Sequence, residues 1–234
     1  MLDGSCRYDA RVLRRLDVDT PLGVVHLVGF AQKPDHRSVI FSILSEFCGE
    51  PVTAADLGES RENPRPHFEK LDFDVNWTHS NGYCVCAYGE RGSKGLMHIG
   101  VDLERYSPRR LHLAERFFSL EEAQLVKSLM EKPCTTENAL ASENANDAAE
   151  REFFCLWSRK EAFYKCVGGD FFEGVLRRSM LQNPVIVPFD KKSPPALQAG
   201  SSRSGKVYLV DVDSASVGMS VPASLCVAVS PFSF

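Results

Sequence analysis

Two carboxylates, Asp102 and Glu104, interrupt an apolar run in the sequence Ile99-Gly100-Val101-Asp102-Leu103-Glu104. In a β-strand these two side chains lie on the same face, roughly 6.6 Å apart along the chain. They can converge on one hard cation, and Mg²⁺ suits the pair because it binds one or two carboxylates together with water and substrate phosphates. Taken alone, the pair is better explained by a solvated strand face that ends in acidic residues, since this triplet is common.

A helical pattern over about residues 152–167 carries a second group of charged side chains. Glu161 and Lys165 form an i, i+4 pair in the order that also suits an ordinary surface ion pair. Lys160 falls within the apolar stripe of the helix, where its ammonium either extends to the surface or reaches a polar pocket. The helix therefore offers one carboxylate and two cations to any site that it borders.

A histidine and two hydroxyls stand near the end of an expected strand, in the sequence Asn76-Trp77-Thr78-His79-Ser80. Charge-assisted hydrogen bonds from such side chains can hold a phosphate. A histidine in a turn is more often simply exposed. This third signal is therefore no stronger by itself than the other two.

Strands and a tight turn must position the histidine and the first two carboxylates. Residues 73–77 and 83–88 predict two strands joined through His79-Ser80-Asn81-Gly82, in which Asn-Gly is a strong tight-turn signal. Residues 97–103 predict a third strand, which contains Asp102. The histidine is thus expected in the turn that follows one strand, and this carboxylate near the end of another.

Helices are expected where apolar residues recur at helical spacing. One stripe runs over residues 39–47 and stops near Gly49. Another helix opens at Ser119, which can cap it, with Glu122 three residues on as in a capping box. Further short apolar strands are expected at residues 24–30, 185–187, 206–212 and 225–229.

Each half of the chain thus contains helices and several strands, without the regular alternation of a parallel α/β sheet. The predicted fold class is α+β. Two subdomains are consistent with this order, residues 1–95 and residues 96–234, of which the second carries Asp102, Glu104, Glu161 and Lys165. Residues 133–150 lack large apolar side chains, which is typical of a mobile insertion or of a solvated helix start.

Composition excludes several classes of protein. The chain has 234 residues, and its net charge of −4 does not fit the uniformly basic surface of a general nucleic-acid binder. None of the eight cysteines stands in a C-x-x-C spacing, and no signal peptide is evident, so we expect reduced cysteines in a cytoplasmic protein. No apolar run approaches the roughly 20 residues that a membrane span needs.

The three signals become specific when they are taken in their order along the chain. Together they resemble the signatures of the 4′-phosphopantetheinyl transferase family, which read roughly F-N-x-S-H-S, [IV]-G-[IV]-D-x-E and W-[ST]-x-K-E-[AS]-x-x-K. Here the signatures are the sequences of residues 75–80, 99–104 and 157–165. Arg116-Phe117-Phe118-Ser119-Leu120-Glu121-Glu122 is similar to the family's R-F-F-S-x-x-E element, and His36-Arg37-Ser38 to its H-R-[ST] element.

The resemblance implies a role for each matching residue. Mg²⁺ would be held against the pyrophosphate of coenzyme A by three carboxylates, those of Asp102, Glu104 and Glu161. Lys165 would contact the phosphates, with Lys160 at the same site, and Glu161, Lys165 and Asp102 would be the catalytic residues. The nucleotide end would be bound by polar and basic side chains, those of Arg37, Ser38, Arg65, Thr78 and His79. Arg65 stands where the family has lysine.

The position of the D-x-E motif indicates a subtype. In the short, trimeric acyl-carrier-protein synthases the motif lies near the N-terminus, whereas about a hundred residues precede it here. This is similar to the longer type that activates surfactin synthetase. That type is a monomer of two similar subdomains in a pseudo-dimeric arrangement, each a small antiparallel sheet packed with helices, with one site between them.

The implied activity is the transfer of 4′-phosphopantetheine from coenzyme A to a serine of an apo acyl or peptidyl carrier protein, with release of 3′,5′-ADP. Fatty-acid, polyketide and nonribosomal peptide systems all remain open as the source of the carrier. Neither nucleic acid nor a membrane is expected as a partner. Two other functions also remain open: a metal-dependent enzyme that cleaves a pyrophosphate without a protein acceptor, and a non-catalytic protein that binds coenzyme A or a carrier.

Overall fold

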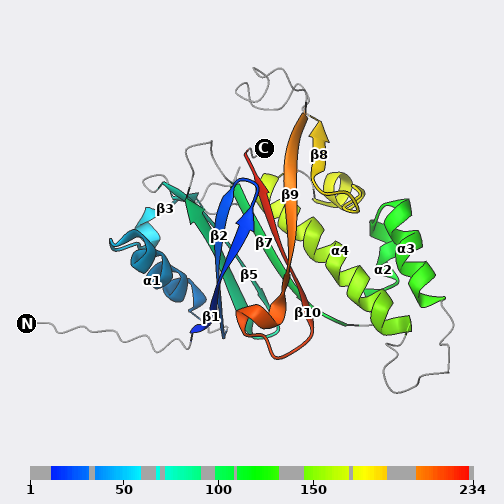
Figure 1. Cartoon of the computed structure of the whole chain (residues 1–234), viewed down its shortest axis with the longest axis horizontal. Coiled ribbons are helices and arrows are strands. Elements are labelled where there is room, and N and C mark those ends of the chain that lie inside the picture. The colour runs from blue at the N-terminus through cyan, green and yellow to red at the C-terminus, as the bar shows by residue number, and fades with distance from the viewer. Residues whose placement is uncertain are drawn as a thin grey trace, which may run out of the picture.

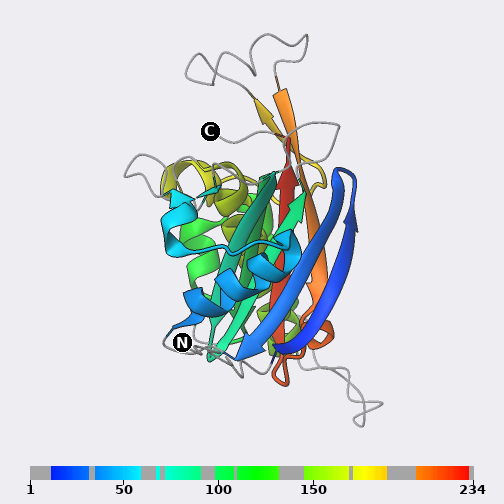
Figure 2. The ribbon, with the colours of Figure 1, turned by 90° about the vertical axis from the view of Figure 1, so that its left-hand side faces the viewer.

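The computed structural model describes residues 12–31, 35–58, 67–68, 72–90, 98–107, 110–131, 145–168, 171–188 and 204–231. These residues form four layers, in which two antiparallel sheets lie between helix α1 on one side and helices α2, α3 and α4 on the other (Figure 1). The view turned by 90° shows α1 in front of the strands (Figure 2). Within the described residues, no helix is both long enough and apolar enough to cross a membrane.

The first sheet has the strand order β1-β2-β6-β5. Its strands are β1 (Val12–Thr20), β2 (Gly23–Ala31), β5 (Phe73–Ser80) and β6 (Tyr83–Glu90). Helix α1 (His36–Cys48) covers one face through the predicted apolar stripe, which packs on Val28, Phe30 and Val75. The helix ends at Gly49, whose φ of 71° is favourable only for residues without a Cβ, as the sequence predicted. A short 3-10 helix (Ala54–Asp56) and the two-residue strands β3 (Leu57–Gly58) and β4 (His67–Phe68) follow α1.

The turn between β5 and β6 is shorter than predicted. Asn81 and Gly82 form it alone, with φ angles of 48° and 86°, which is the backbone that the Asn-Gly pair favours in two-residue hairpins. His79 and Ser80 therefore belong to the strand, and their side chains point to opposite faces of the sheet. This difference decides which neighbours each of them meets.

The second sheet has the strand order β7-β10-β9-β8. Its strands are β7 (His98–Arg105), β8 (Val185–Pro188), β9 (Ser204–Asp213) and β10 (Ala223–Ser230). The helices beside it are α2 (Leu113–Phe117), α3 (Leu120–Met130), α4 (Ala145–Val167) and a π-helical turn η4 (Phe171–Val175), and a 3-10 turn η5 (Ser214–Val217) follows β9. The predicted capping box of Ser119 and Glu122 begins α3. Residues 145–150, which the sequence left as either insertion or helix start, form the first turns of α4, and residues 132–144 lie outside the described ones.

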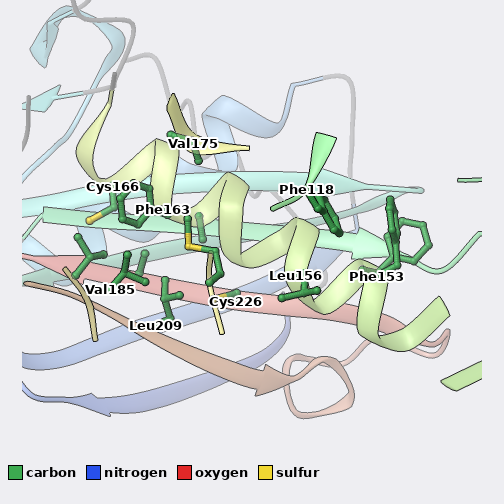
Figure 3. Packing of buried hydrophobic residues seen from close by; sticks show 14 of the residues in the cluster. Phe118, Phe153, Leu156, Phe163, Cys166, Val175, Val185, Leu209 and Cys226 are labelled. Atoms are coloured by element: carbon green, nitrogen blue, oxygen red, sulfur yellow. The ribbon is translucent and has the colours of Figure 1, made fainter. Parts of the chain in front are cut away.

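Three apolar cores separate the four layers. One lies between α1 and the first sheet, and one lies between the two sheets, where Leu27 and Val85 meet Val101 and Val227. The third lies between the second sheet and its helices, and in Figure 3 Leu156 and Phe163 of α4 lie over the strands that carry Leu209 and Cys226. Two four-stranded antiparallel sheets packed with helices confirm the α+β prediction and are consistent with a fold of two subdomains.

Candidate active site

Side chains of β5 join the first sheet to the edge strand β7 of the second sheet. Every second residue of β5 faces this seam. Three backbone N–H groups of β7 donate hydrogen bonds to side-chain oxygens of β5. The N–H of Ile99 donates to Asp74 (2.6 Å), that of Val101 to Asn76 (3.5 Å) and that of Arg105 to Ser80 (3.3 Å). Because the seam fixes β5 against β7, Thr78 is placed beside Asp102.

Asp102 lies at the centre of the site, with only 4% of its surface exposed. Its Oδ1 accepts hydrogen bonds from the Thr78 hydroxyl (3.2 Å) and from the Lys165 ammonium (2.7 Å). Its Oδ2 is buried and has no hydrogen-bond partner in the part of the chain that the structure describes. Burial raises the pKa of the Asp102 carboxyl, and the charge of Lys165 opposes this rise. A buried carboxylate oxygen without a partner is costly unless a ligand completes its contacts.

Glu104 and Glu161 are the other two carboxylates of this site. Burial, together with the charge of Asp102, raises the pKa of each of them to about 7. Lys165 lowers both values in part, and Arg110, whose Nη1 lies 3.7 Å from a Glu104 carboxylate oxygen, lowers that of Glu104. Burial and the neighbouring carboxylates therefore disfavour the ionised form of these two side chains more than the nearby cations favour it. Across the described ranges, no three His, Cys, Asp or Glu side chains already stand close enough together to hold a metal.

Gly100 allows α4 to approach β7 closely enough to complete the site. A Cβ at this position would lie 2.0 Å from the carbonyl oxygen of Ala162 and 2.5 Å from the backbone nitrogen of Cys166. Both atoms belong to the backbone of α4, which cannot move aside as a flexible side chain does. The glycine of the G-x-D-x-E pattern thus lets the helix bring Lys165 against Asp102.

The predicted nucleotide-binding residues divide between two places. Thr78 is buried in the seam, where its hydroxyl contacts Asp102 and Lys165. His79 points to the opposite face of β5 and lies exposed beside the start of α1, with its ring 5.9 Å from that of His36. His36 was not among the predicted site residues, although the two residues that follow it, Arg37 and Ser38, were.

Arg37 and Ser38 lie in the first turn of α1, near the His36–His79 pair. The Ser38 hydroxyl donates a hydrogen bond to Asp35, which caps the helix, and the Arg37 side chain is exposed. The predicted contact Arg65 lies outside the described residues. The start of α1 thus supplies two of the predicted nucleotide contacts next to His79.

Lys160 does not lie with Lys165 at the carboxylate cluster. Its ammonium is fully buried and contacts Glu122 at 2.7 Å and the carbonyl oxygen of Arg178 at 2.5 Å. Lys160 and Lys165 are five residues apart and therefore project from different faces of α4. Of the two alternatives left open by the sequence, a polar pocket and not the surface receives this ammonium.

Comparison with known proteins assigns the family. The sequence profile of the 4′-phosphopantetheinyl transferase superfamily matches residues 98–213. The chain belongs to this superfamily. The transferase match begins at β7 and includes Asp102, Glu104, Glu161 and Lys165, whereas β5 with Thr78 and His79 precedes it.

Individual 4′-phosphopantetheinyl transferases support the same assignment. The chain is 32% identical over 111 residues to the transferase psf-1 of Bacillus pumilus, which is 47% of this chain and 39% of the relative. It is 28% identical over 145 residues to the transferase Sfp of Bacillus subtilis strain 168, covering 59% of this chain and 55% of the relative. For the transferase HetI of a Nostoc species the identity is 29% over 137 residues, or 56% and 49% of the two chains. The chain thus spans about half the length, or less, of the curated transferases it matches, and the match to Sfp supports the longer type.

Proposed function

We propose that this chain is an Mg²⁺-dependent enzyme that transfers 4′-phosphopantetheine from coenzyme A to a serine of an apo acyl or peptidyl carrier protein and releases 3′,5′-ADP. The observation that carries the proposal is the group of three buried or partly buried carboxyls at the seam. Asp102 has a buried oxygen without a partner among the described residues, and two further carboxyls near it have pKa values raised to about 7. We propose that the enzyme is a cytoplasmic monomer.

The donor set fits Mg²⁺ by its chemistry. Carboxylate oxygens are the ligands that this ion prefers, and it leaves room for water and substrate phosphates. Asp102, Glu104 and Glu161 would hold it. When bound, Mg²⁺ supplies charge neutralisation at the pyrophosphate of coenzyme A. The free Oδ2 of Asp102 supports this assignment, because it has a lone pair to offer without breaking a bond to Thr78 or Lys165.

Glu161 is the proposed general base. A carboxyl with a pKa of about 7 is partly ionised at neutral pH and can accept the proton of the carrier serine, directly or through one water. Lys165 is the proposed cation for the phosphates, since its ammonium already stands beside Asp102 and Thr78. At the nucleotide end we propose His79, Arg37, Ser38 and Arg65, with Thr78 acting from the seam.

The carrier must bring its serine to Glu161, so its docking surface must border this face of α4. The residues after Gly168 and the Arg177-Arg178 pair are the candidates for that surface. Arg177 donates to the carbonyl oxygens of Arg116 and Phe118, and Arg178 donates to that of Ile186. Both arginines thus also serve the fold. The exposed ring of Phe172, in the turn that follows α4, remains available for a partner.

A direct assay tests the proposed function. The protein is incubated with coenzyme A, Mg²⁺ and a panel of apo acyl and peptidyl carrier proteins, and the carriers are weighed by mass spectrometry. We expect each accepted carrier to gain one phosphopantetheine, and we expect no gain when its serine is replaced by alanine or when a chelator removes the metal. Hydrolysis of coenzyme A without any carrier would instead indicate a pyrophosphate-cleaving enzyme. Binding of coenzyme A without transfer to any carrier would indicate a non-catalytic protein.

The raised pKa values predict how metal and pH act together on stability. Glu104 and Glu161 have an ordinary pKa of 4.5 and a value of about 7 in the folded protein. The folded state therefore binds more protons than the unfolded state between these values, so the metal-free protein loses stability as pH rises through them. Mg²⁺ binds the ionised carboxylates, and we expect it to raise the melting temperature by at least roughly 5 °C near pH 8 and by much less near pH 5.

The control for this prediction is the double variant E104Q/E161Q, measured by thermal unfolding with Mg²⁺ and with chelator. It lacks both titrating groups, so its stability without metal should change less with pH than that of the wild type. An equal effect of Mg²⁺ at both pH values would contradict a metal site built from these carboxylates.

A further inference from the structure

Lys160 and Glu122 form a fully buried ion pair behind the proposed active site. Both side chains have 0% of their surface exposed, and the ammonium lies 2.7 Å from a carboxylate oxygen. Removing two charges from water is costly, and such a pair persists only where further hydrogen bonds satisfy it. Loss of one partner would leave the other charge buried without compensation.

The remaining hydrogen bonds of this pair join three segments of the chain. Glu122 accepts from the backbone N–H and the hydroxyl of Ser119 at the start of α3 (3.0 and 2.9 Å) and from the N–H of Met180 (2.7 Å). Lys160 donates to the carbonyl oxygen of Arg178. The pair therefore fastens α3 and the segment 178–180, which follows the turn η4, to helix α4.

Neighbouring arginines reinforce the same connection. Arg177 donates to the carbonyl oxygens of Arg116 (2.6 Å) and Phe118 (3.2 Å), just before α3. Arg159 of α4 donates a hydrogen bond to the carbonyl oxygen of Met180 (3.3 Å). The ammonium of Lys160 also lies 5.1 Å from the centre of the Phe118 ring, within the range of a cation–π contact. Residues 177–180 are thus held from both sides.

The turn η4, which precedes the fastened residues 177–180, carries aromatic side chains that pack on α4. Phe171 packs against Tyr164 and Trp157 of α4, with ring centres 5.2 and 6.3 Å away. Trp157, Glu161 and Tyr164 are spaced i, i+4 and i+7, so they share one face of the helix. Phe172, 67% exposed, lies 5.5 Å from Phe171.

The surface of these aromatic side chains has both an apolar and a cationic part. The ring of Phe172 lies 6.3 Å from that of Phe117, and the exposed guanidinium of Arg116 lies 5.0 Å from the centre of the Phe117 ring. We call Phe117, Phe171 and Phe172 the aromatic ledge. An acceptor protein whose serine reaches Glu161 must lie against the ledge, and the guanidinium suits the acidic surroundings that are typical of a carrier serine.

We propose that Lys160 and Glu122 are positioning residues that hold the aromatic ledge against the Glu161 face of α4, and that they thereby set the affinity for the carrier protein and not that for coenzyme A. This inference rests on the proposed function. It differs from the role that the family resemblance implied for Lys160, which would place its ammonium at the coenzyme A phosphates.

Three variants test the pair without an activity assay: K160M, E122Q and the uncharged double variant K160M/E122Q. K160M leaves the Glu122 carboxylate buried alone, and we expect its melting temperature to fall by roughly 10 °C, with at least half of the loss recovered in the double variant. In all three, hydrogen exchange should accelerate in residues 171–180 and stay unchanged in β7. Unchanged exchange in residues 171–180 would overturn the proposal.

Kinetics separate the two roles of Lys160. For E122Q and the double variant we expect the KM for the carrier to rise roughly tenfold, with the KM and the calorimetric affinity for coenzyme A unchanged. F172A, which alters the ledge and leaves the ion pair intact, should raise the KM for the carrier similarly without a loss of stability. Adding F172A to the double variant should then raise the KM for the carrier little further, because both changes act through the aromatic ledge.

The opposite result is equally well defined. A higher KM and weaker binding for coenzyme A, with an unchanged KM for the carrier, would show that Lys160 acts at the phosphates. If the wild type itself transfers nothing, the proposed function fails, while unfolding and hydrogen exchange still decide whether the pair positions residues 171–180.

Discussion

Replacement of Glu161 by glutamine is expected to lower kcat for phosphopantetheine transfer by roughly 10²- to 10⁴-fold, the range for loss of a general base. Glutamine keeps the size of the side chain and its place in α4, but it can neither accept the serine proton nor offer an anionic oxygen to a cation. Burial and the charge of Asp102 raise the pKa of Glu161 to about 7 in the metal-free protein, and its place beside Asp102 and Lys165 brings it to the proposed phosphate site. The measurement is the rate of mass gain of the carrier at saturating coenzyme A and carrier.

The control is Glu152→Gln, a change of the same kind in the same helix. Glu152 is also partly buried, and burial raises its pKa, but its charged neighbours are Arg159, Asp211 and Glu122. We expect E152Q to transfer within about twofold of the wild type. Without metal, we expect E161Q to unfold at no lower a temperature than the wild type near pH 8. More than about a tenth of the wild-type kcat in E161Q would contradict the assignment of the base.

Gly100→Ala is expected to destabilise the protein strongly, with a loss on the order of 3 kcal/mol. The added methyl group would lie 2.0 Å from the Ala162 carbonyl oxygen and must push α4 away from β7. Because Glu161 and Lys165 are on α4, the displacement should also reduce transfer by the molecules that remain folded. Chemical denaturation measures the first effect, and kcat below the unfolding transition measures the second.

Gly29→Ala is the matched control for this variant. Its Cβ would lie 2.2 Å from the carbonyl oxygen of Val217, so it should cost similar stability at a contact between β2 and η5. The folded fraction of G29A should keep its activity, since α4 is not displaced. Equal losses of kcat in both variants, measured per folded molecule, would refute a specific role for the approach of α4 to β7.

Local signals in the sequence were enough for much of the fold. The Ser119–Glu122 capping box and the stop at Gly49 each depend on residues close in sequence, and both are found as predicted. The Asn-Gly signal correctly located the turn between β5 and β6, although the turn is two residues shorter than predicted. The Asp102 and Glu104 strand was recognisable for the same reason. Helix α4 was predicted too short, because residues 145–150 contain no large apolar side chain to extend the stripe.

Contacts between distant segments could not be read in this way. Lys160 was unusual as a charged residue within an apolar stripe, but its partner Glu122 was already assigned to a capping box. The local sequence does not show that one carboxylate both caps α3 and pairs with Lys160. Thr78 and His79 are adjacent in sequence, and the alternation of a strand sends them to different surroundings. The prediction of a loop there concealed this difference. The helical turn η4 has only five residues, which is too short to show a periodic pattern of apolar residues.

The side-chain seam makes this site a property of two halves of the chain. Asp102 takes one hydrogen bond from Thr78 of the first sheet and another from Lys165 of a helix on the second. Neither half holds the full set, and no backbone ladder of the kind found within each sheet joins β5 to β7. If the chain were divided between β6 and β7, transfer activity would therefore require the two fragments to associate. Addition of phosphopantetheine to a carrier would then measure the association of the fragments, as the signal of a split reporter enzyme does.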